Sequence, residues 1–415
     1  MTNPARSQVF SVGPYEVWML AQGALGFVVY GGIMFLIPLH VIAQGGTPAD
    51  TGAVVALAGV LGLTGPFFGG VADRFRAYRG VQLAALTLLA LSAAMFAYAR
   101  EELTWLLAAG LLGLGTSGTS VINRTFIAGA GFDPPTQARK LALLQLSLPA
   151  GQVLGLAAIA ALRSAGFSIP ALFLTMAAAA LVFTVAVSLV NAAAARRVVG
   201  AARPVVATAK ATAVVPLRSV LFSQFGLSLL LTFLIMVSAQ GIESQYPSYM
   251  ESVFAIDPER SAAALAVIML ISIPLYLLAG RWTARSGPRV PFLVSAAVRA
   301  VAGAALLALP GSAGMAALTV FGVIMVVYPL FELNAAVLAS TTSPLGPGAG
   351  QGASGAALAL GAVVAAIVAG WLAQQFGFAS LACIPVLAAG AAAVLGVTML
   401  RAPSATTEGP HGSAS

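Results

Sequence analysis

Long apolar runs without a single charge recur along this chain. One of them, Thr51 to Phe68, contains no charged residue. A helix needs about 20 such residues to cross a hydrocarbon core of about 30 Å. Apolar residues make up 60% of the chain, whereas soluble domains hold about 45–50%. The runs are continuously apolar instead of alternating, which excludes barrel strands. The sequence therefore predicts an all-α integral membrane protein.

Charged or Gly/Pro-rich stretches divide the chain into twelve candidate transmembrane helices. Their approximate bounds are 14–41, 50–71, 80–99, 103–127, 141–162, 168–191, 219–249, 261–281, 291–309, 314–338, 352–375 and 379–400.

The longest polar interruption, 192–218, predicts a cytoplasmic central loop between two sets of six helices. We expect an N-terminal six-helix bundle at 14–191 and a C-terminal one at 219–401. A short segment, 1–13, precedes them. The tail 402–415 is rich in Ser, Thr, Gly and Pro and is predicted to be disordered.

Basic residues predict the orientation. With both termini in the cytoplasm, the inner loops and tails hold fifteen Lys and Arg residues and the outer loops only Arg100, Arg163 and Arg260. This bias is the positive-inside pattern of a multi-pass protein of the cell (plasma or inner) membrane. It also accounts for the net charge of +8 without nucleic-acid binding. Cys383 is the one cysteine, so neither a metal site nor a cofactor is expected.

Two related loops reveal an internal repeat. "GGVADRFRAYRG" (69–80) follows the second span, and "AGRWTARSGPRV" (279–290) follows the eighth. Gly69 and Gly280 are 211 residues apart, about half the chain. Similar motifs at this offset indicate that the two halves are structural repeats.

Both loops resemble the signature G-x-L-A-D-R-x-G-R-[KR] of the major facilitator superfamily. The first copy departs at Arg76, where the family has glycine, and the second has Ala284 in place of aspartate. The resemblance implies two pseudo-symmetric six-helix bundles that rock about a central cavity. The matching residues, for which we expect a gate or latch role, are Gly69, Asp73, Arg74, Gly280, Arg285, Gly287 and Arg289.

Asp73 opposes the basic bias of its loop, so we expect it to have a specific partner. The start of span eleven, "GPGAGQGASG" (346–355), is uncharged. The N-terminus of a helix carries free N–H groups and about +0.5 of a charge. A contact between Asp73 and this terminus, which the resemblance also implies, would close the cytoplasmic side. Gly69 would then allow the two helices to approach closely.

Polar residues within spans are costly in a membrane and indicate function. Glu243 in span seven and Glu332 in span ten are candidate substrate or proton sites, with Arg124 in span four as a gate partner of Glu332. The sequence leaves Arg299 in span nine unexplained, with extension to the headgroups and pairing with a lipid as the two options. The remaining candidates of the central site are Gln22, Tyr30, Gln240, Gln245, Tyr246 and Asn334.

The sequence contains no G-x-x-x-x-G-K-[ST] loop for ATP and nothing that resembles a catalytic triad, so we expect no enzyme. The prediction is a monomeric secondary transporter for a small organic solute, with protons as the coupling ion and efflux as the favoured direction. Two alternatives stay open. One is an importer of a sugar or similar nutrient, and the other is a transport-inactive membrane scaffold on the same fold.

Overall fold

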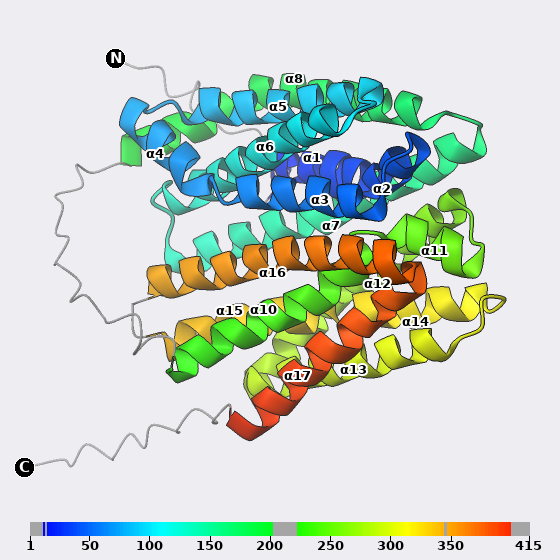
Figure 1. Ribbon diagram of the computed structural model, residues 1–415. Helices are drawn as coiled ribbons and strands as arrows, with labels where there is room; N and C mark the ends of the chain where they lie inside the picture. The colour runs from blue at the N-terminus through cyan, green and yellow to red at the C-terminus, as the bar shows by residue number, and fades with distance from the viewer. Residues whose placement is uncertain (1–10, 13–14, 202–221, 344–346, 400–415) are drawn as a thin grey trace, which may run out of the picture.

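The computed structural model describes residues 11–12, 15–201, 222–343 and 347–399 (Figure 1). Within these ranges, twelve helical spans are long and apolar enough to cross a membrane. The predicted all-α membrane fold with twelve spans is confirmed. Strand structure in the described ranges consists of the pair β1 (Ser11–Val12) and β2 (Tyr15–Glu16).

The first six spans form one bundle, coloured blue to green in Figure 1. Span one is built from four consecutive helical segments: η2 (Val17–Met19), α1 (Leu20–Ala24), the π-helical η3 (Leu25–Ile33) and α2 (Met34–Ala43). The other five spans are α3 (Pro48–Gly62) with α4 (Gly65–Phe75), α5 (Tyr78–Tyr98), α6 (Glu102–Ala128), α7 (Pro134–Ser164) and α8 (Ile169–Ala201).

The second bundle, green to red, lies beside the first in Figure 1. Two of its spans are interrupted: α10 (Gln224–Glu243) is followed by α11 (Tyr246–Phe254), and α14 (Gly314–Val326) by α15 (Tyr328–Thr342). The remaining elements are α12 (Pro258–Ser286), α13 (Arg289–Ala308), α16 (Pro347–Phe376), η4 (Phe378–Ala382) and α17 (Cys383–Met399).

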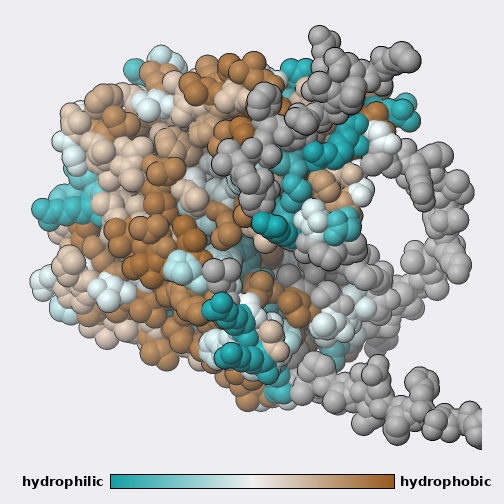
Figure 2. Space-filling view, turned by 180° about the vertical axis from the view of Figure 1, so that it is seen from behind, coloured by the Kyte–Doolittle hydropathy of each residue, from teal (hydrophilic) through white to brown (hydrophobic). Residues whose placement is uncertain are grey.

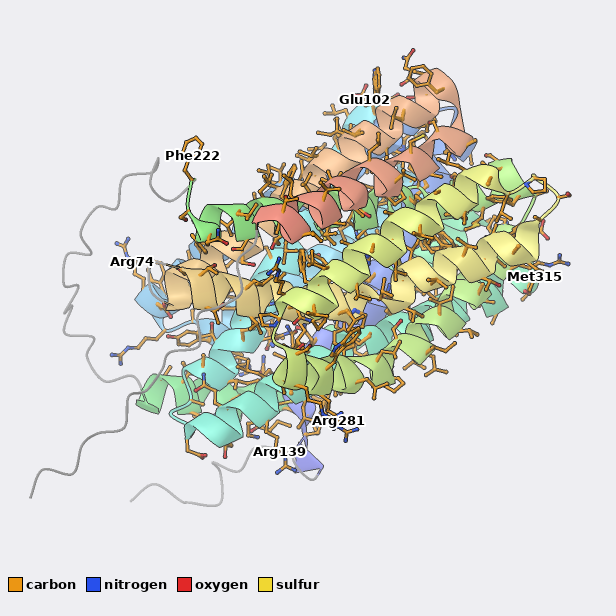
Figure 3. All side chains as sticks on the ribbon, turned by 90° about the horizontal axis from the view of Figure 1, so that it is seen from below. Arg74, Glu102, Arg139, Phe222, Arg281 and Met315 are labelled. Atoms are coloured by element: carbon orange, nitrogen blue, oxygen red, sulfur yellow. The ribbon has the colours of Figure 1, made fainter. Side chains whose placement is uncertain are left out.

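Surface chemistry separates an apolar middle from two polar ends. Apolar side chains cover the middle of the face in Figure 2, and hydrophilic ones gather toward its ends. Arg74 lies at one end of the molecule, and Glu102 and Met315 lie toward the other (Figure 3). We call the end with loops 69–80 and 279–290 the inner end, which the sequence predicts to be cytoplasmic, and the opposite one the outer end.

Polar caps determine where several helices begin. Thr47 accepts a hydrogen bond from the Asp50 backbone N–H, and Asp50 accepts one from the Thr47 N–H in return, which closes a capping box before α3. Asp133 caps α7 by accepting a single hydrogen bond from the Thr136 N–H. At the C-terminal end of the first bundle, α8 continues to Ala201, past the expected start of the central loop at 192.

Span seven breaks between Glu243 and Tyr246, because Pro247 lies in the first turn of α11 and cannot continue the preceding helix. The 211-residue offset relates Glu243 to Gly32, which lies in the π-helical segment η3. Each bundle therefore carries a helix irregularity at the same place in the repeat. Irregular helical turns of this kind are frequent at functional sites.

The two bundles pack against each other near the outer end, where α3 meets α16. A Cβ atom at Gly52 would lie 2.4 Å from the Ala366 carbonyl oxygen, and one at Gly370 would lie 2.6 Å from that of Pro48. The Gln245 side chain also donates a 3.0 Å hydrogen bond to the Pro48 carbonyl. Small residues permit this backbone contact, so the outer ends of spans two and eleven are closed together.

At the inner end of the first bundle, Glu16 joins three helices. Its buried carboxylate forms ion pairs with Lys140 of α7 and Arg197 of α8 and accepts a 2.6 Å hydrogen bond from the Trp18 indole. Burial alone would raise the pKa of Glu16, but the hydrogen bonds from Lys140, Trp18 and Arg197 outweigh it and lower the pKa below its ordinary value.

Candidate substrate and proton site

Glu243 occupies the last turn of α10, at the break in span seven. Its side chain is half-buried and accepts a 2.6 Å hydrogen bond from the Gln240 amide, one turn earlier. The following helix, α11, is buried from Tyr246 to Met250. Glu243 therefore lies within the packed bundle, as the last residue of a candidate membrane span.

Glu332 lies in the second turn of α15, below the interruption of span ten at Val327. It is half-buried, and its carboxylate accepts a 2.7 Å hydrogen bond from the Tyr276 hydroxyl of α12. Pro329 in the first turn explains why the span is interrupted here. Both predicted acids thus lie beside a helix break, each with one hydrogen-bond donor and part of its surface exposed.

Tyr30 faces these acids from the first bundle. Although it lies in the middle of span one, its side chain is 36% exposed. The charges of Glu243, Glu332 and Arg124 all act on its hydroxyl. Tyr30 of the first bundle therefore lies within electrostatic reach of Glu243 and Glu332 of the second bundle.

Arg124 is exposed on α6, and its charge acts on Glu332. Among the residues that the structure describes, the two side chains form no ion pair within 4.0 Å. The Tyr276 hydroxyl occupies one oxygen of Glu332 instead. The predicted gate pair is therefore not closed in this conformation.

Gln22, a predicted cavity residue, is buried in a ladder of amide side chains. Its amide lies 2.9 Å from that of Asn123, which contacts Gln82 at 2.7 Å. Gln82 in turn hydrogen-bonds Asn191 at 2.8 Å. The ladder joins spans one, four, three and six, and each of its side chains has at least one hydrogen-bond partner in another span. Gln22 therefore serves packing within the first bundle here.

The polar groups of three further candidates form hydrogen bonds to neighbouring parts of the protein. Gln245 bonds the Pro48 carbonyl, and the Tyr246 hydroxyl donates to the Ser261 carbonyl at 3.1 Å. Asn334 donates to the Leu330 carbonyl and accepts from the Thr283 hydroxyl. All three are buried. Their side chains connect helices, which the sequence pattern could not distinguish from a role in binding.

The predicted latch is not formed by described residues. Asp73 accepts a 2.8 Å hydrogen bond from Tyr78, within its own bundle. A Cβ atom at Gly69 would meet Val121 of α6 at 3.4 Å and no described atom of α16 within 4 Å, so the described residues do not form the expected close approach to span eleven. Residue 346 of the predicted docking segment 346–355 lies outside the described residues, and Asp73 docking stays a prediction.

The two signature loops nevertheless share one contact. Arg79, at the start of α5, donates a 2.9 Å hydrogen bond to the Ser188 carbonyl of α8. Arg289, at the start of α13, donates one of 3.0 Å to the Val397 carbonyl of α17. These arginines tie equivalent helices of the two bundles.

The other basic and glycine positions of the loops serve as surface or turn residues. Gly287 ends α12 with a φ of 73°, and Arg285 in the last turn of that helix is exposed. Gly280 has open space where a Cβ would lie. In the first loop, the Arg74 guanidinium lies 5.5 Å from the Phe75 ring centroid.

Arg299 takes neither of the two positions that the sequence left open for it. It is 0% exposed, so it neither reaches headgroups nor contacts lipid. Its guanidinium lies 5.7 Å from the centre of the Tyr328 ring. Tyr276 and Tyr328 were not among the predicted site residues. Polar residues in the middle of spans eight and ten were the available signal, but the sequence does not show toward which side each points.

Comparison with known proteins agrees with the twelve-span helical fold described above. The family model described as Major Facilitator Superfamily matches residues 19–346 and 229–415. A search of curated protein sequences found no match.

Several solved structures share the whole fold. The nucleoside transporter NupG has a TM-score of 0.71 at 13% identity, over 92% of this chain and 96% of that chain. A D-xylose-proton symporter has 0.71 at 14%, over 93% and 97%. A bacterial homolog of the human lysosomal transporter Spinster, in an inward-facing and occupied conformation, has 0.67 at 15%, over 96% and 95%. At these identities, the likeness concerns the fold alone.

Proposed function

Because the chain belongs to the major facilitator superfamily, we propose that it is a proton-coupled secondary transporter that carries a small organic solute between its two bundles. The observation that carries the proposal is that two partly exposed carboxylates, Glu243 and Glu332, lie at the helix breaks of spans seven and ten, within electrostatic reach of Tyr30 of the opposite bundle. Substrate sites of secondary transporters lie at such repeat interfaces, beside interrupted helices.

The two acids support proton coupling. Each carboxylate keeps part of its surface exposed and has one neutral donor, Gln240 for Glu243 and Tyr276 for Glu332. Neither is held in an ion pair among the described residues. A carboxylate in this setting can accept a proton or the positively charged or donor group of a solute, and intramembrane acids of this kind mark proton relays.

Two carboxylates and tyrosine hydroxyls favour a neutral or cationic solute over an anion. NupG and the D-xylose-proton symporter are named for neutral polar solutes, which keeps the importer alternative open. Efflux remains our predicted direction, and the cell membrane with both termini inside remains the predicted location.

Contact between Gly52 and Gly370 supports alternating access. It closes the outer end, while Gly69 and Asp73 at the inner end have their partners within the first bundle. Rocking of the bundles would separate the outer contact and bring the inner ends together. The Asp73 latch would act in that second state.

Reconstituted vesicles test the proposal. Proteoliposomes are loaded with pyranine to report internal pH and are tested with and without a pH gradient. The probes are ethidium, an organic cation, and the neutral solutes uridine and D-xylose. We expect an ethidium flux that is accompanied by proton movement. Glu243→Gln and Glu332→Gln should each reduce this flux at least tenfold. Glu102→Gln, an exposed acid at the outer end, is the control. Uptake of uridine or D-xylose would establish the importer alternative, and no flux of any probe would overturn the proposal in favour of the scaffold.

A further inference from the structure

Gln245 connects the two bundles at the closed outer end. Its amide nitrogen Nε2 donates a 3.0 Å hydrogen bond to the Pro48 carbonyl oxygen, in the first turn of α3, and its side chain is 0% exposed. Among the hydrogen bonds and ion pairs between described residues, this is the one that joins the first bundle to the second. A directional bond at this position can control whether the outer end opens.

The next residue along the chain binds in the opposite direction. The Tyr246 hydroxyl donates a 3.1 Å hydrogen bond to the Ser261 carbonyl of α12, and its ring stacks on that of Phe321 of α14, with ring centroids 4.4 Å apart. Both partners belong to the second bundle, so Tyr246 anchors α11 in its own bundle while Gln245 reaches the other. Opening of the outer end would therefore break the Gln245 bond and leave the Tyr246 contacts in place.

The acceptor of this bond is held in a fixed position by the start of α3. The Asp50 carboxylate accepts hydrogen bonds of 2.7 Å from the Thr47 backbone N–H and 2.9 Å from the Thr47 hydroxyl. The Asp50 N–H donates one of 3.2 Å to the Thr47 hydroxyl in return. Pro48 lies between them, with a φ that its ring fixes. The Pro48 carbonyl is therefore already oriented when Gln245 meets it, which reduces the entropy lost when the bond forms.

Half of the Gln245 amide is unsatisfied in the closed state. Its oxygen Oε1 is buried and has no hydrogen-bond partner among the described residues. A buried, unpaired carbonyl is costly, and opening of the outer end would give water access to both amide groups. The cost at Oε1 offsets part of the gain at Nε2, so the bond can hold the closed state and still be broken in each transport cycle.

We propose that Gln245 is the outer latch, which we define as its hydrogen bond to the Pro48 carbonyl: the outer end is closed while this bond exists and opens when it breaks. Gln245 is the N-cap of α11 and follows Glu243 by two residues at the break in span seven. A shift of this break when Glu243 binds a proton or a solute would move the donor away from Pro48. The inference rests on the alternating access of the proposed function and names the bond that sets the balance between its two states.

Spin labels measure the opening without any solute. In a Cys383→Ser background, Glu102→Cys of the first bundle and Met315→Cys of the second carry nitroxide labels in nanodiscs, because both residues are exposed at the outer end (Figure 3). Double electron–electron resonance gives the ratio of open to closed populations. Gln245→Asn keeps the amide but is one methylene too short to reach Pro48. It should raise this ratio about tenfold, the effect of losing one buried hydrogen bond.

Gln245→Glu separates the bond from the effect of burial, because glutamate has the length of glutamine. At pH 8 its carboxylate has no proton to donate, so the outer end should open. At pH 5 the protonated carboxyl group can donate its O–H to Pro48 and should restore the closed state, whereas Gln245→Asn should stay open. The unmodified protein at both pH values provides the baseline for the titratable groups on either side of the bond, which are Asp50 of α3, Glu243 of α10, and Tyr246 and Tyr249 of α11.

Matched variants show whether the effect is specific. Gln44→Asn and Gln44→Glu make the same changes at an exposed glutamine of the outer end and should leave the ratio unchanged at both pH values. Thr47→Val removes the cap that orients Pro48, so it should favour opening by itself. Its effect should not add to that of Gln245→Asn, because both substitutions act on one bond. If Gln245→Glu does not fold, this cycle and the Gln44 comparison still test the latch.

The outcomes separate the outer latch from the proposed function. A Gln245→Asn protein that is as closed as the unmodified one would overturn the latch, and so would a Gln245→Glu protein that is as open at pH 5 as at pH 8. Either result is compatible with proton-coupled ethidium flux that depends on Glu243. Opening by Gln245→Asn and closing of Gln245→Glu at pH 5, in a protein that moves none of the three probes, would support the latch and contradict the proposed transport.

Discussion

The Arg79 guanidinium donates a 2.9 Å hydrogen bond to the Ser188 carbonyl oxygen, which joins the start of α5 to α8. Arg289 makes the same contact with Val397 in the second bundle, at 3.0 Å. The repeat recognised in the two loops therefore extends to a shared tertiary contact. In each bundle, a basic residue that the positive-inside rule requires also supplies a donor to a neighbouring helix.

Removing either of these arginines should destabilise its bundle to a similar degree. We expect Arg79→Ala and Arg289→Ala each to lower the free energy of unfolding by about 0.5–1 kcal/mol, because charge-assisted hydrogen bonds are stabilising but solvent weakens them at the surface. Thermal midpoints in nanodiscs measure the effect. Arg285→Ala, an exposed residue of the same loop, should be within error of the unmodified protein, and an equal loss there would contradict the assignment.

Arg76 has a backbone conformation that glycine adopts more readily. Its φ of 49° and ψ of 33° are left-handed, at the end of α4, and this conformation costs a residue with a Cβ about 1–2 kcal/mol. Arg76→Gly should therefore stabilise the protein by about 1 kcal/mol. Arg74→Gly, inside α4, should destabilise it by about 1 kcal/mol. Opposite shifts of the thermal midpoint are expected, and shifts of the same sign would refute the explanation.

The outer contact between the bundles should not tolerate a side chain at Gly52. A Cβ there would lie 2.4 Å from the Ala366 carbonyl oxygen, so Gly52→Leu should hold the outer end open. Gly62→Leu is the control in the same helix, because no atom lies within 4 Å of a Cβ at that position.

Accessibility measures this effect. In a Cys383→Ser background, a cysteine replaces Phe35, which is buried and lies against Tyr246 with ring centroids 6.3 Å apart. A membrane-impermeant maleimide should label it at least fivefold faster in Gly52→Leu. Equal labelling in the Gly52 and Gly62 variants would mean that this contact does not close the outer end.

Glu16 should make stability depend on acid pH. Its pKa is lowered in the folded state by the hydrogen bonds from Lys140, Trp18 and Arg197, which outweigh burial. Its contribution is therefore present above the unfolded pKa of about 4.3 and is lost as pH falls through the lower folded value. The fall in thermal midpoint between pH 6 and pH 3 should be smaller in Glu16→Gln than in the unmodified protein. Glu102→Gln, an exposed acid, should keep the full dependence.

Much of the site could be anticipated because acids within apolar spans are rare. Glu243, Glu332 and Tyr30 were predicted on this reasoning, and the charges of both acids act on the Tyr30 hydroxyl. Gln22 was predicted on the same reasoning, yet it lies in a buried amide ladder. Gln22 and Tyr30 share span one, but the π-helical segment η3 departs from the regular turn of an α-helix. The face that each side chain occupies could therefore not be projected from the sequence.

Arg299 shows the same limit of prediction from sequence. An arginine in a span can extend to the headgroups or turn inward, and the sequence around it is compatible with both. Only the packing of α13 against the break in span ten buries it beside Tyr328.

Sequence alone determined the twelve spans, their predicted orientation, the division into two related halves and the superfamily. These follow from the length and charge of each segment taken separately, because transfer into a bilayer depends on composition over about 20 residues. Tertiary structure decided which polar side chains face the interior, which pair within a bundle, and which end of the molecule is closed. Those outcomes depend on the rotation of each helix about its axis and on partners more than a hundred residues away, such as Pro48 for Gln245, which no local pattern specifies.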